Sequence, residues 1–507
     1  MIDTQHCEQW KRLSPRMLLV HPSYELLREL PLLIAVVVFS PPLGNRVWLV
    51  ALIGLIAGVG VTRWFTTTYR IEPDPETGRI QLRTGLLRRR VLSVPRNRIR
   101  SVQTDAGLLH RMLGLTVLRV STGQNAAGDD TFELNALRSA DVPVLRAQLL
   151  AHAGQPVLAA DPATPATELA RWRPSWLRYS PLSLSGLALA AAAVGALYQS
   201  AIWPAVQTSV IRPSWIDAAE RAGVGRTLTV IAAVLVVVSM ALAVLRSLVT
   251  YGNLLLTRST GPKGEVLVLR YGVLRVREHN YDMRRLRGGT LRQPLLVRLF
   301  GGARLDAAMT GVTGEGESSI LLPPCPSAVA EQVLASLVAD PDAVSGPLRR
   351  HGPAATRRRW TRALLLPLGV GSGLAAATAF AAVPLWCWPA WAALTVLGAM
   401  LAADRAHALG HRVDEHWLSA RTGSWERRRY CVATAGIVGW TVRQSWFQRR
   451  AKVATLIAAT AAGVKAYRVV DVPQQWAWSV AAQASPWVAD SAWARPNSAG
   501  GGSGGTR

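Results

Sequence analysis

Lysine is nearly missing from this sequence. Only four lysines, Lys11, Lys263, Lys452 and Lys465, stand among 57 basic residues, so arginine carries the positive charge. Acidic residues number 31, which leaves a formal net charge of +26. Arginine stays ionised and makes forked contacts with phosphate, so this balance suits an anionic lipid surface or a nucleic acid. A GC-rich genome would also enrich arginine, and composition alone leaves these alternatives open.

Cysteine is scarce as well. The four cysteines are scattered and form no C-x-x-C pair, which argues against a disulfide framework or a zinc ribbon. The phosphate-loop pattern G-x-x-x-x-G-K-[ST] does not occur. A Gly-x-Ser-x-Gly string at 501–505 lies in a Gly/Ser-rich tail, where a flexible terminus is a better interpretation than a catalytic serine. The sequence therefore predicts neither an enzyme nor a cofactor.

Charge is absent from several long runs. The longest are at 179–211, 227–245 and 363–403, and two shorter ones lie at 30–44 and 47–62. A helix that crosses a bilayer needs about 20 apolar residues. Helices of soluble proteins keep one polar face, and 227–245 has none. We therefore expect six transmembrane helices in three hairpins, with a re-entrant first pair as an alternative because its runs are short.

The distribution of basic residues predicts the orientation. Arginines cluster beside the apolar runs in the long polar segments, whereas the loops within the expected hairpins carry few. By the positive-inside rule, the N terminus and the three polar segments face the cytoplasm. No cleavable signal peptide is expected, since the first apolar run follows about 29 polar or mixed residues. The expected location is the inner membrane of a bacterium, crossed several times.

The three polar segments share one sequence pattern at a constant offset. A glycine and, later, an arginine recur in each copy, and the first copy also has Gly114 three residues after its arginine. The equivalent positions are Gly85, Gly272 and Gly423, and Arg111, Arg298 and Arg449. Each copy follows an apolar pair, so the repeating unit is a hairpin followed by a module.

Each module is expected to consist of short strands closed by one helix. Residues 66–85 contain an acidic turn between two alternating runs, and 116–122 and 131–134 predict further strands. The expected organisation is a cytoplasmic segment (1–24), hairpin 1 (25–65), module 1 (66–154), a linker (155–178), hairpin 2 (179–248), module 2 (249–340), a basic linker (341–362), hairpin 3 (363–403), a divergent module 3 (404–486) and a flexible tail (487–507). The predicted fold class is α+β, with a small β-barrel or sandwich in each module.

Two segments of module 1 resemble a known family. The segment 97–103 (NRIRSVQ), followed by 107–120 (GLLHRMLGLTVLRV), is similar to the bacterial PH-like domain. Three copies behind membrane hairpins resemble the YdbT-type PH-domain membrane proteins. The resemblance implies a PH-like barrel with a C-terminal helix and, often, a shorter PH-domain membrane protein as partner. Module 3 departs from the pattern, since Ala451, Lys452 and Val453 replace Leu113, Gly114 and Leu115.

Arginine runs recur just after the shared glycine and are the candidate site for lipid or partner binding. They are Arg88, Arg89 and Arg90; Arg275 and Arg277; and Arg427, Arg428 and Arg429. Either they contact anionic headgroups, or they form a solvated strand edge where positive charge discourages aggregation. His407 and His411 form a weak metal candidate, one helical turn apart if the last helix extends that far, but no metal is predicted.

The sequence therefore predicts a non-catalytic membrane scaffold. Its three cytoplasmic modules would bind anionic lipid headgroups or protein partners. Nucleic acid is not expected, because no stacking aromatics accompany the arginines. The alternative is a membrane transporter or export component with regulatory modules, although the strongest apolar runs contain no ionisable residue. The oligomeric state stays open.

Overall fold

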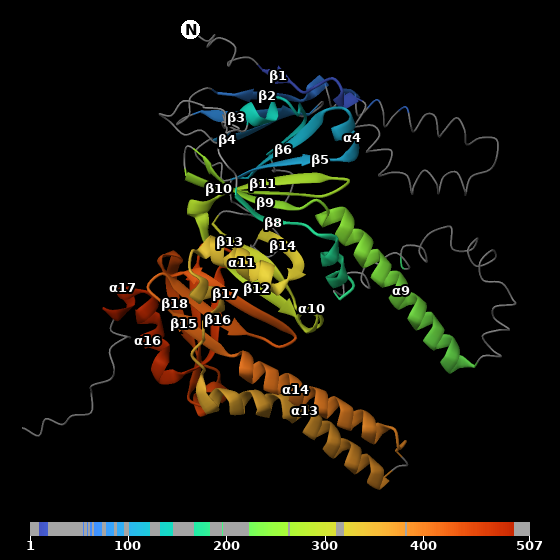
Figure 1. Cartoon of the computed structure of the whole chain (residues 1–507), viewed down its shortest axis with the longest axis vertical. Helices are drawn as coiled ribbons and strands as arrows, with labels where there is room; N and C mark the ends of the chain where they lie inside the picture. The colour runs from blue at the N-terminus through green and yellow to red at the C-terminus, as the bar shows by residue number, and fades with distance from the viewer. Residues whose placement is uncertain are drawn as a thin grey trace, which may run out of the picture. The chain divides into compact units, whose positions relative to one another are not determined.

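Figure 1 shows the computed structural model of the chain. It describes residues 10–18, 61–62, 65–72, 78–85, 89–95, 101–121, 132–145, 167–182, 223–261, 264–310, 319–380 and 383–490, and the single positions Gly54, Gly58 and Gly195. The chain divides into two compact units, Met1–Arg284 and Arg285–Arg507. The boundary falls inside module 2, so each unit contains part of that module.

The first unit contains two antiparallel sheets. One has four strands in sequence order, β1 (Lys11–Arg12), β2 (Thr68–Ile71), β3 (Arg79–Thr84) and β4 (Arg90–Pro95). The other has seven strands in the order β7 (Phe132–Arg138), β6 (Leu115–Ser121), β5 (Ser101–Ala106), β11 (Val276–Asp282), β10 (Gly264–Tyr271), β9 (Leu255–Gly261) and β8 (Thr167–Arg171). Its described helices include α4 (Leu108–Met112), the 3-10 helix η3 (Pro174–Tyr179) and α9 (Val224–Tyr251).

The second unit contains a six-stranded and a three-stranded sheet. The first has the order β14 (Ser319–Pro326), β13 (Gly302–Met309), β12 (Leu286–Pro294), β17 (Glu426–Ala433), β16 (Trp417–Thr422) and β15 (Gly410–Val413). The second has the order β18 (Ile437–Arg443), β19 (Val453–Thr460) and β20 (Ala466–Pro473). The helices are α10 (Leu295–Leu299), α11 (Ser327–Val338), α12 (Pro341–Ser345), α13 (Gly352–Phe380), α14 (Cys387–Ala408), α15 (Trp446–Arg450), α16 (Gln474–Ala484) and α17 (Pro486–Ala489).

The threefold repeat is confirmed by the order of elements. Modules 1, 2 and 3 contain β2 to β7, β9 to β14 and β15 to β20, and each has one short helix, α4, α10 or α15, after its fourth strand. Helices α11 and α16 close modules 2 and 3, and Val333 and Leu337, four residues apart on α11, are buried. The closing helix of module 1 is described only to residue 145.

The shared glycine is required by the turn between the second and third strand of each module. Gly85, Gly272 and Gly423 have φ angles of 108°, 107° and 96°, a region that residues with a side chain avoid. A Cβ at Gly272 or Gly423 would also collide with the backbone carbonyl oxygen of Arg275 or Glu426. The recurrence of this glycine therefore has a steric cause.

The end of each short helix explains the divergence of module 3. Gly114, Gly301 and Lys452 occupy the same position after α4, α10 and α15, with φ angles of 66°, 72° and 53°. Lys452 therefore adopts the left-handed conformation that glycine adopts in the other modules. The replacement changes the energetic cost of this turn and leaves its backbone path intact.

Consecutive modules share their sheets, which the sequence did not indicate. In the first unit, β5 of module 1 pairs with β11 of module 2, and Ala106 lies opposite Val276; we call this joint 1. In the second unit, β12 of module 2 pairs with β17 of module 3, and Gln293 lies opposite Arg427; we call this joint 2. By the repeat offset these are equivalent positions, so both joints have the same register.

The segments before the expected hairpins also join the sheets. Strand β1 pairs with β2, β8 pairs with β9, and Arg349 forms a bridge with His411. Residues 155–178 and 341–362, expected as linkers, therefore contain ordered elements, among them β8, η3 and α12. The chain thus leaves each sheet and returns to it at neighbouring positions.

Three described helices are long and apolar enough to cross a bilayer: α9, α13 and α14. Hairpin 3 is longer than expected, because α13 begins at Gly352 and α14 continues to Ala408. The two helices pack together (Figure 1). The Trp391 indole N–H donates to the carbonyl oxygen of Pro367 at 2.8 Å. Hairpin 1 and the first helix of hairpin 2 lie largely outside the described residues.

Replacing Gly423 with alanine tests the steric argument for the repeat. We expect Gly423→Ala to destabilise the protein by about 2 kcal/mol or more, because Ala disfavours positive φ and its Cβ would meet a carbonyl oxygen. Thermal unfolding of the full chain in detergent, followed by tryptophan fluorescence, would measure the loss. Gly373→Ala is the control, since nothing lies within 4 Å of that position. Equal unfolding temperatures for both variants would contradict the argument.

Candidate functional site

The arginine run of module 1 lies at the start of β4. Arg89 and Arg90 are exposed there, and Arg88 lies outside the described residues. Strand β4 pairs with β3, and its other side pairs with no strand in the described part of the chain. The third strands of modules 2 and 3, in contrast, carry their arginines into the joints. The structure thus places the three runs at equivalent positions with different surroundings.

Joint 1 contains a chain of four alternating charges. Arg275 donates from Nε to Oδ1 of Asp105 at 2.6 Å and makes a second bond to the same carboxylate. Asp105 is buried and also lies 3.9 Å from Arg119, which pairs with Glu133 at 2.6 Å. A cavity of about 420 Å³ opens beside these side chains. A buried carboxylate requires such partners, because removing either one would leave an uncompensated charge.

Joint 2 contains a charge chain of opposite sign. Glu426, Arg292 and Asp306 stand at the strand positions of Arg275, Asp105 and Arg119 in joint 1. Ile320 takes the position of Glu133, and the fourth charge, Arg304, lies on β13 two residues before Asp306. Arg292 lies 3.6 Å from Glu426 and 2.6 Å from Asp306, and Arg304 pairs with Asp306 at 2.8 Å. Asp306 is fully buried, whereas the side chain of its counterpart Arg119 is 43% exposed. The two joints thus carry opposite charges at three equivalent positions.

The arginines of module 3 are held by the protein itself. Arg427 donates to Asp404 at 2.5 Å, and Arg428 donates from Nε to Glu426 at 2.8 Å. Arg429 donates to the carbonyl oxygens of Ala343 and Gly346, and burial lowers its pKa. In module 2, Arg277 lies opposite Asp105 in the β5–β11 pairing. Their predicted role in lipid binding stays a prediction, and these contacts give them a structural role.

The signature arginine of each module connects to the module that follows. Arg111 donates to the carbonyl oxygen of Val273, in the turn after Gly272, at 3.0 Å. Its counterpart Arg298 donates to Asp404 near the end of α14 at 2.9 Å. Arg449, in the last module, is exposed. The repeat of this arginine therefore reflects contacts between neighbours rather than within one module.

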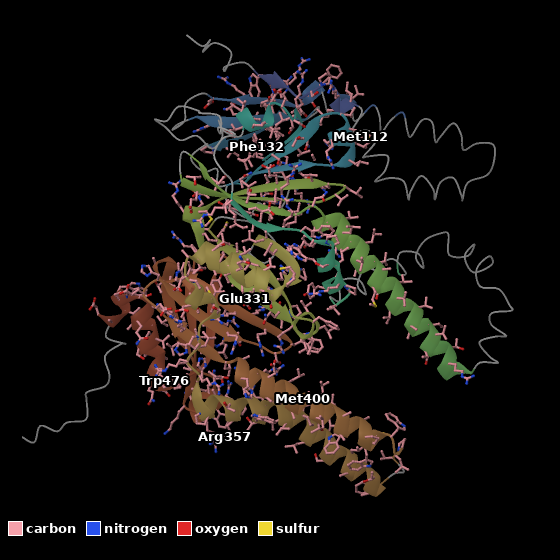
Figure 2. All side chains as sticks on the ribbon, in the orientation of Figure 1. Met112, Phe132, Glu331, Arg357, Met400 and Trp476 are labelled. Atoms are coloured by element: carbon pink, nitrogen blue, oxygen red, sulfur yellow. The ribbon has the colours of Figure 1, made fainter. Side chains whose placement is uncertain are left out.

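The short helices carry exposed apolar side chains next to these arginines. Met112 at the end of α4 is 77% exposed, Phe300 after α10 is 61% exposed, and Phe447 on α15 is 68% exposed. Figure 2 shows Met112 on the surface of the first unit. Further exposed members are Leu108 and Leu109, Leu296 and Leu299, and Trp446. Each module therefore has the same patch of apolar and basic residues, which we call the short-helix patch.

Each short-helix patch is linked to the base of an apolar helix. In the first unit, Arg111 holds the turn at Val273, whose N–H donates to Val249 near the end of α9 at 3.1 Å. In the second unit, α10 reaches α14 through Arg298 and Asp404. Gln448 of α15 donates to Asp471 at 2.9 Å, and Arg359 near the start of α13 pairs with the same carboxylate at 2.6 Å.

By the repeat offset Leu109, Leu296 and Phe447 are equivalent positions of the three modules. All three are exposed in the structure. Their recurrence directly beside Arg111, Arg298 and Arg449 is the signal that could have identified a surface patch, since apolar residues next to arginine on a short helix suit an interface.

His411 faces His351 and not His407. Helix α14 ends at Ala408, so His411 lies on β15, and its Nδ1 is 2.9 Å from Nε2 of His351. Nδ1 of His351 lies 2.9 Å from the carbonyl oxygen of Val470 and must therefore carry a proton. Burial lowers the pKa of both histidines to about 4, so the pair is neutral at pH 7. The described residues contain no group of three or more side chains suited to a metal.

The profile of the bacterial PH domain family matches the chain three times, over residues 26–153, 184–339 and 363–481. Each match begins in an apolar hairpin and continues through the module behind it. The family unit therefore coincides with the repeating unit of the sequence and of the strand order. No curated protein and no solved structure matches the chain.

Reversing the charges of joint 1 tests whether its charge chain holds the modules together. Asp105→Arg alone places three arginines together, and we expect a loss of about 3 kcal/mol in the free energy of unfolding. The fourfold variant with Asp105→Arg, Arg275→Glu, Arg119→Asp and Glu133→Arg reverses all four charges of joint 1, three of them to the signs found in joint 2, and should recover at least half of that loss. Thermal unfolding of the full chain measures both. A fourfold variant no more stable than Asp105→Arg would contradict this role.

The histidine pair predicts a pH dependence of stability. Because the folded pKa values are about 4 and the unfolded ones about 6.5, the unfolded state binds protons first as the pH falls. Stability is therefore fully present above about pH 6.5 and should decrease by about 2 kcal/mol per histidine at about pH 5. Unfolding temperatures between about pH 7.5 and about pH 5 measure this decrease. His351→Gln with His411→Gln should flatten the curve, and His407→Gln, at an exposed position, should not.

Proposed function

Because the chain belongs to the bacterial PH domain family, we propose that it is a non-catalytic membrane scaffold of the YdbT type. Its PH-like modules bind anionic lipid headgroups and protein partners. The single observation that carries this proposal is the position of the short-helix patches. Each exposes apolar side chains beside arginine, and each is linked to the base of α9, α13 or α14.

The proposed topology is six membrane-spanning helices in three hairpins. Strands before and after each hairpin are neighbours, as β1 with β2, β8 with β9, and Arg349 with His411. A chain that leaves and re-enters the same sheet must cross the bilayer an even number of times between these points. The basic flanks favour a cytoplasmic location for the N terminus and the modules, in the inner membrane of a bacterium.

The short-helix patches then lie at the level where the spanning helices leave the bilayer. Leu, Met, Phe and Trp side chains there gain free energy by entering the acyl boundary, while neighbouring arginines stay among the headgroups. Each cation near an anionic surface adds about 1 kcal/mol. Because the spanning helices already tether the modules, the patches orient the modules on the membrane rather than recruit them to it.

Among the predicted arginines, we assign headgroup contact first to Arg88, Arg89 and Arg90. Arg89 and Arg90 are exposed at the start of β4. Arg275, Arg427 and Arg428 each pair with a carboxylate, which reduces the positive charge they offer to a lipid. Modules 2 and 3 therefore contact lipid mainly through their short-helix patches, and a shorter PH-domain membrane protein is the partner that the family resemblance implies.

Fluorescent labels on the three patches test the membrane contact. Single cysteines at Met112, Phe300 or Phe447, in a chain without Cys7 and Cys387, carry an environment-sensitive fluorophore in vesicles that contain phosphatidylglycerol. We expect lipids with nitroxide groups in the upper acyl region to quench each label by roughly twofold or more, because these side chains enter the acyl boundary. Replacing phosphatidylglycerol with a zwitterionic lipid should reduce the quenching.

Gln332→Cys provides the matched control, since Gln332 is exposed on α11 and belongs to no short-helix patch. Its label should remain unquenched in the same vesicles. Quenching that is equal at all four positions, or absent from the three patches, would contradict the proposal.

A further inference from the structure

Strand β18 of module 3 ends the series of joints. Its counterparts β5 and β12 each pair with two strands, one in their own module and one in the next. Among the described residues, β18 pairs only with β19. It has the same bulge as β12, between Ile437 and Gly439, and the same short helix behind it. Strand β18 (Figure 1) therefore shares the features of β5 and β12, but its outer edge pairs with no strand in the described part of the chain.

The packing of module 3 does not require a glycine at position 439 of β18. In joint 2 the first paired residue, Gly288, has a φ angle of 134°, and a Cβ there would collide with the carbonyl oxygen of Cys431 on the joined strand. Its equivalent in β18 is Gly439, where a Cβ would meet nothing closer than the Cβ of Ala459, at 3.9 Å. Module 3 alone would accept a side chain at this position. A strand that approached Gly439 as closely as β17 approaches Gly288 would leave no room for a side chain there, whereas in joint 1, where the paired residues of β5 are 103–106, the equivalent residue is Ser101.

The charge at the end of β18 predicts which charge the joining strand must carry. Arg443 stands at the position of Asp105 in joint 1 and Arg292 in joint 2, where the joined strand supplies Arg275 or Glu426 as the opposite charge. Arg443 is exposed and has no acidic partner in the described part of the chain. The strand that joins β18 should therefore carry Asp or Glu at the position of Glu426.

A second copy of this chain does not meet that requirement. The edge that corresponds to the joining strands β11 and β17 is β4 of module 1. The position equivalent to Glu426 is Arg88 in the sequence, followed by the exposed Arg89 and Arg90. Arg443 would then face arginines, and like charges across a strand pair are unfavourable. We infer that β18 binds, by antiparallel strand addition, the edge strand of a PH-like module on a different polypeptide, which carries an acidic residue opposite Arg443.

A peptide from joint 2 serves as the probe for this edge. It comprises residues 424–433 with Cys431→Ser and a fluorescent label, and it contains Glu426 in the required position. We expect saturable binding to the full chain in detergent, measured by fluorescence anisotropy. Arg443→Glu and Gly439→Ala should each weaken this binding by roughly tenfold or more, and a peptide with Glu426→Arg should prefer the Arg443→Glu chain.

We expect module 3 to fold in both variants, because Arg443 is exposed and Gly439 has space for a methyl group. Unchanged unfolding temperatures would verify this. The inference would be overturned if the peptide shows no saturable binding, or if neither substitution weakens its binding. A wild-type dimer that Gly439→Ala dissociates would also overturn it, because the occupant would then be a second copy. The lipid experiment concerns the short-helix patches, so its failure leaves this result interpretable.

Discussion

The architecture depends on the pairing of strand edges between consecutive modules. An edge strand has a row of unpaired N–H and C=O groups, which must find water or another strand. Here β5 and β12 bond to β11 and β17 of the next module in equivalent register. Each module therefore completes the sheet of its neighbour, and two separate sheet edges become one continuous sheet at each joint. The modules are parts of an array, and their boundaries in sequence are not boundaries between sheets.

The charges at the joints make this pairing specific. Backbone hydrogen bonds are the same for any strand, so a shared register alone would let any module join any other. Joint 1 presents Arg275 to a buried Asp105, whereas joint 2 presents Glu426 to Arg292. A wrong neighbour would bring like charges together in a site with little water, which costs more than it would at the surface. The reversed signs therefore favour the covalent order of the modules.

The same turns connect the joints to the long apolar helices. The glycine turn of module 2 receives Arg111 from module 1 and donates to the end of α9, and the turn of module 3 receives Arg405 from α14 through Ser424. The short-helix patches are therefore tied to the ends of α9, α13 and α14. The proposed scaffold role requires this rigidity, because partner and lipid contacts are useful only if the modules keep one orientation. The proposed partner edge at β18 extends the same principle to another polypeptide.

Periodicity and composition determined much of this protein without any structure. Apolar runs longer than a bilayer predict spanning helices, and the recurrence of Gly85, Gly272 and Gly423 reveals three copies, since both signals are local in sequence. The strands and the helices α11 and α16 follow from the same local patterns. Only tertiary structure decided which strands meet across copies. Pairing partners such as Asp105 and Arg275 are 170 residues apart, and nothing local distinguishes an arginine that binds a carboxylate from one that faces water. The exposure of Leu109 and Phe447 was decided in the same way, because burial depends on what packs against a residue and not on its own hydropathy.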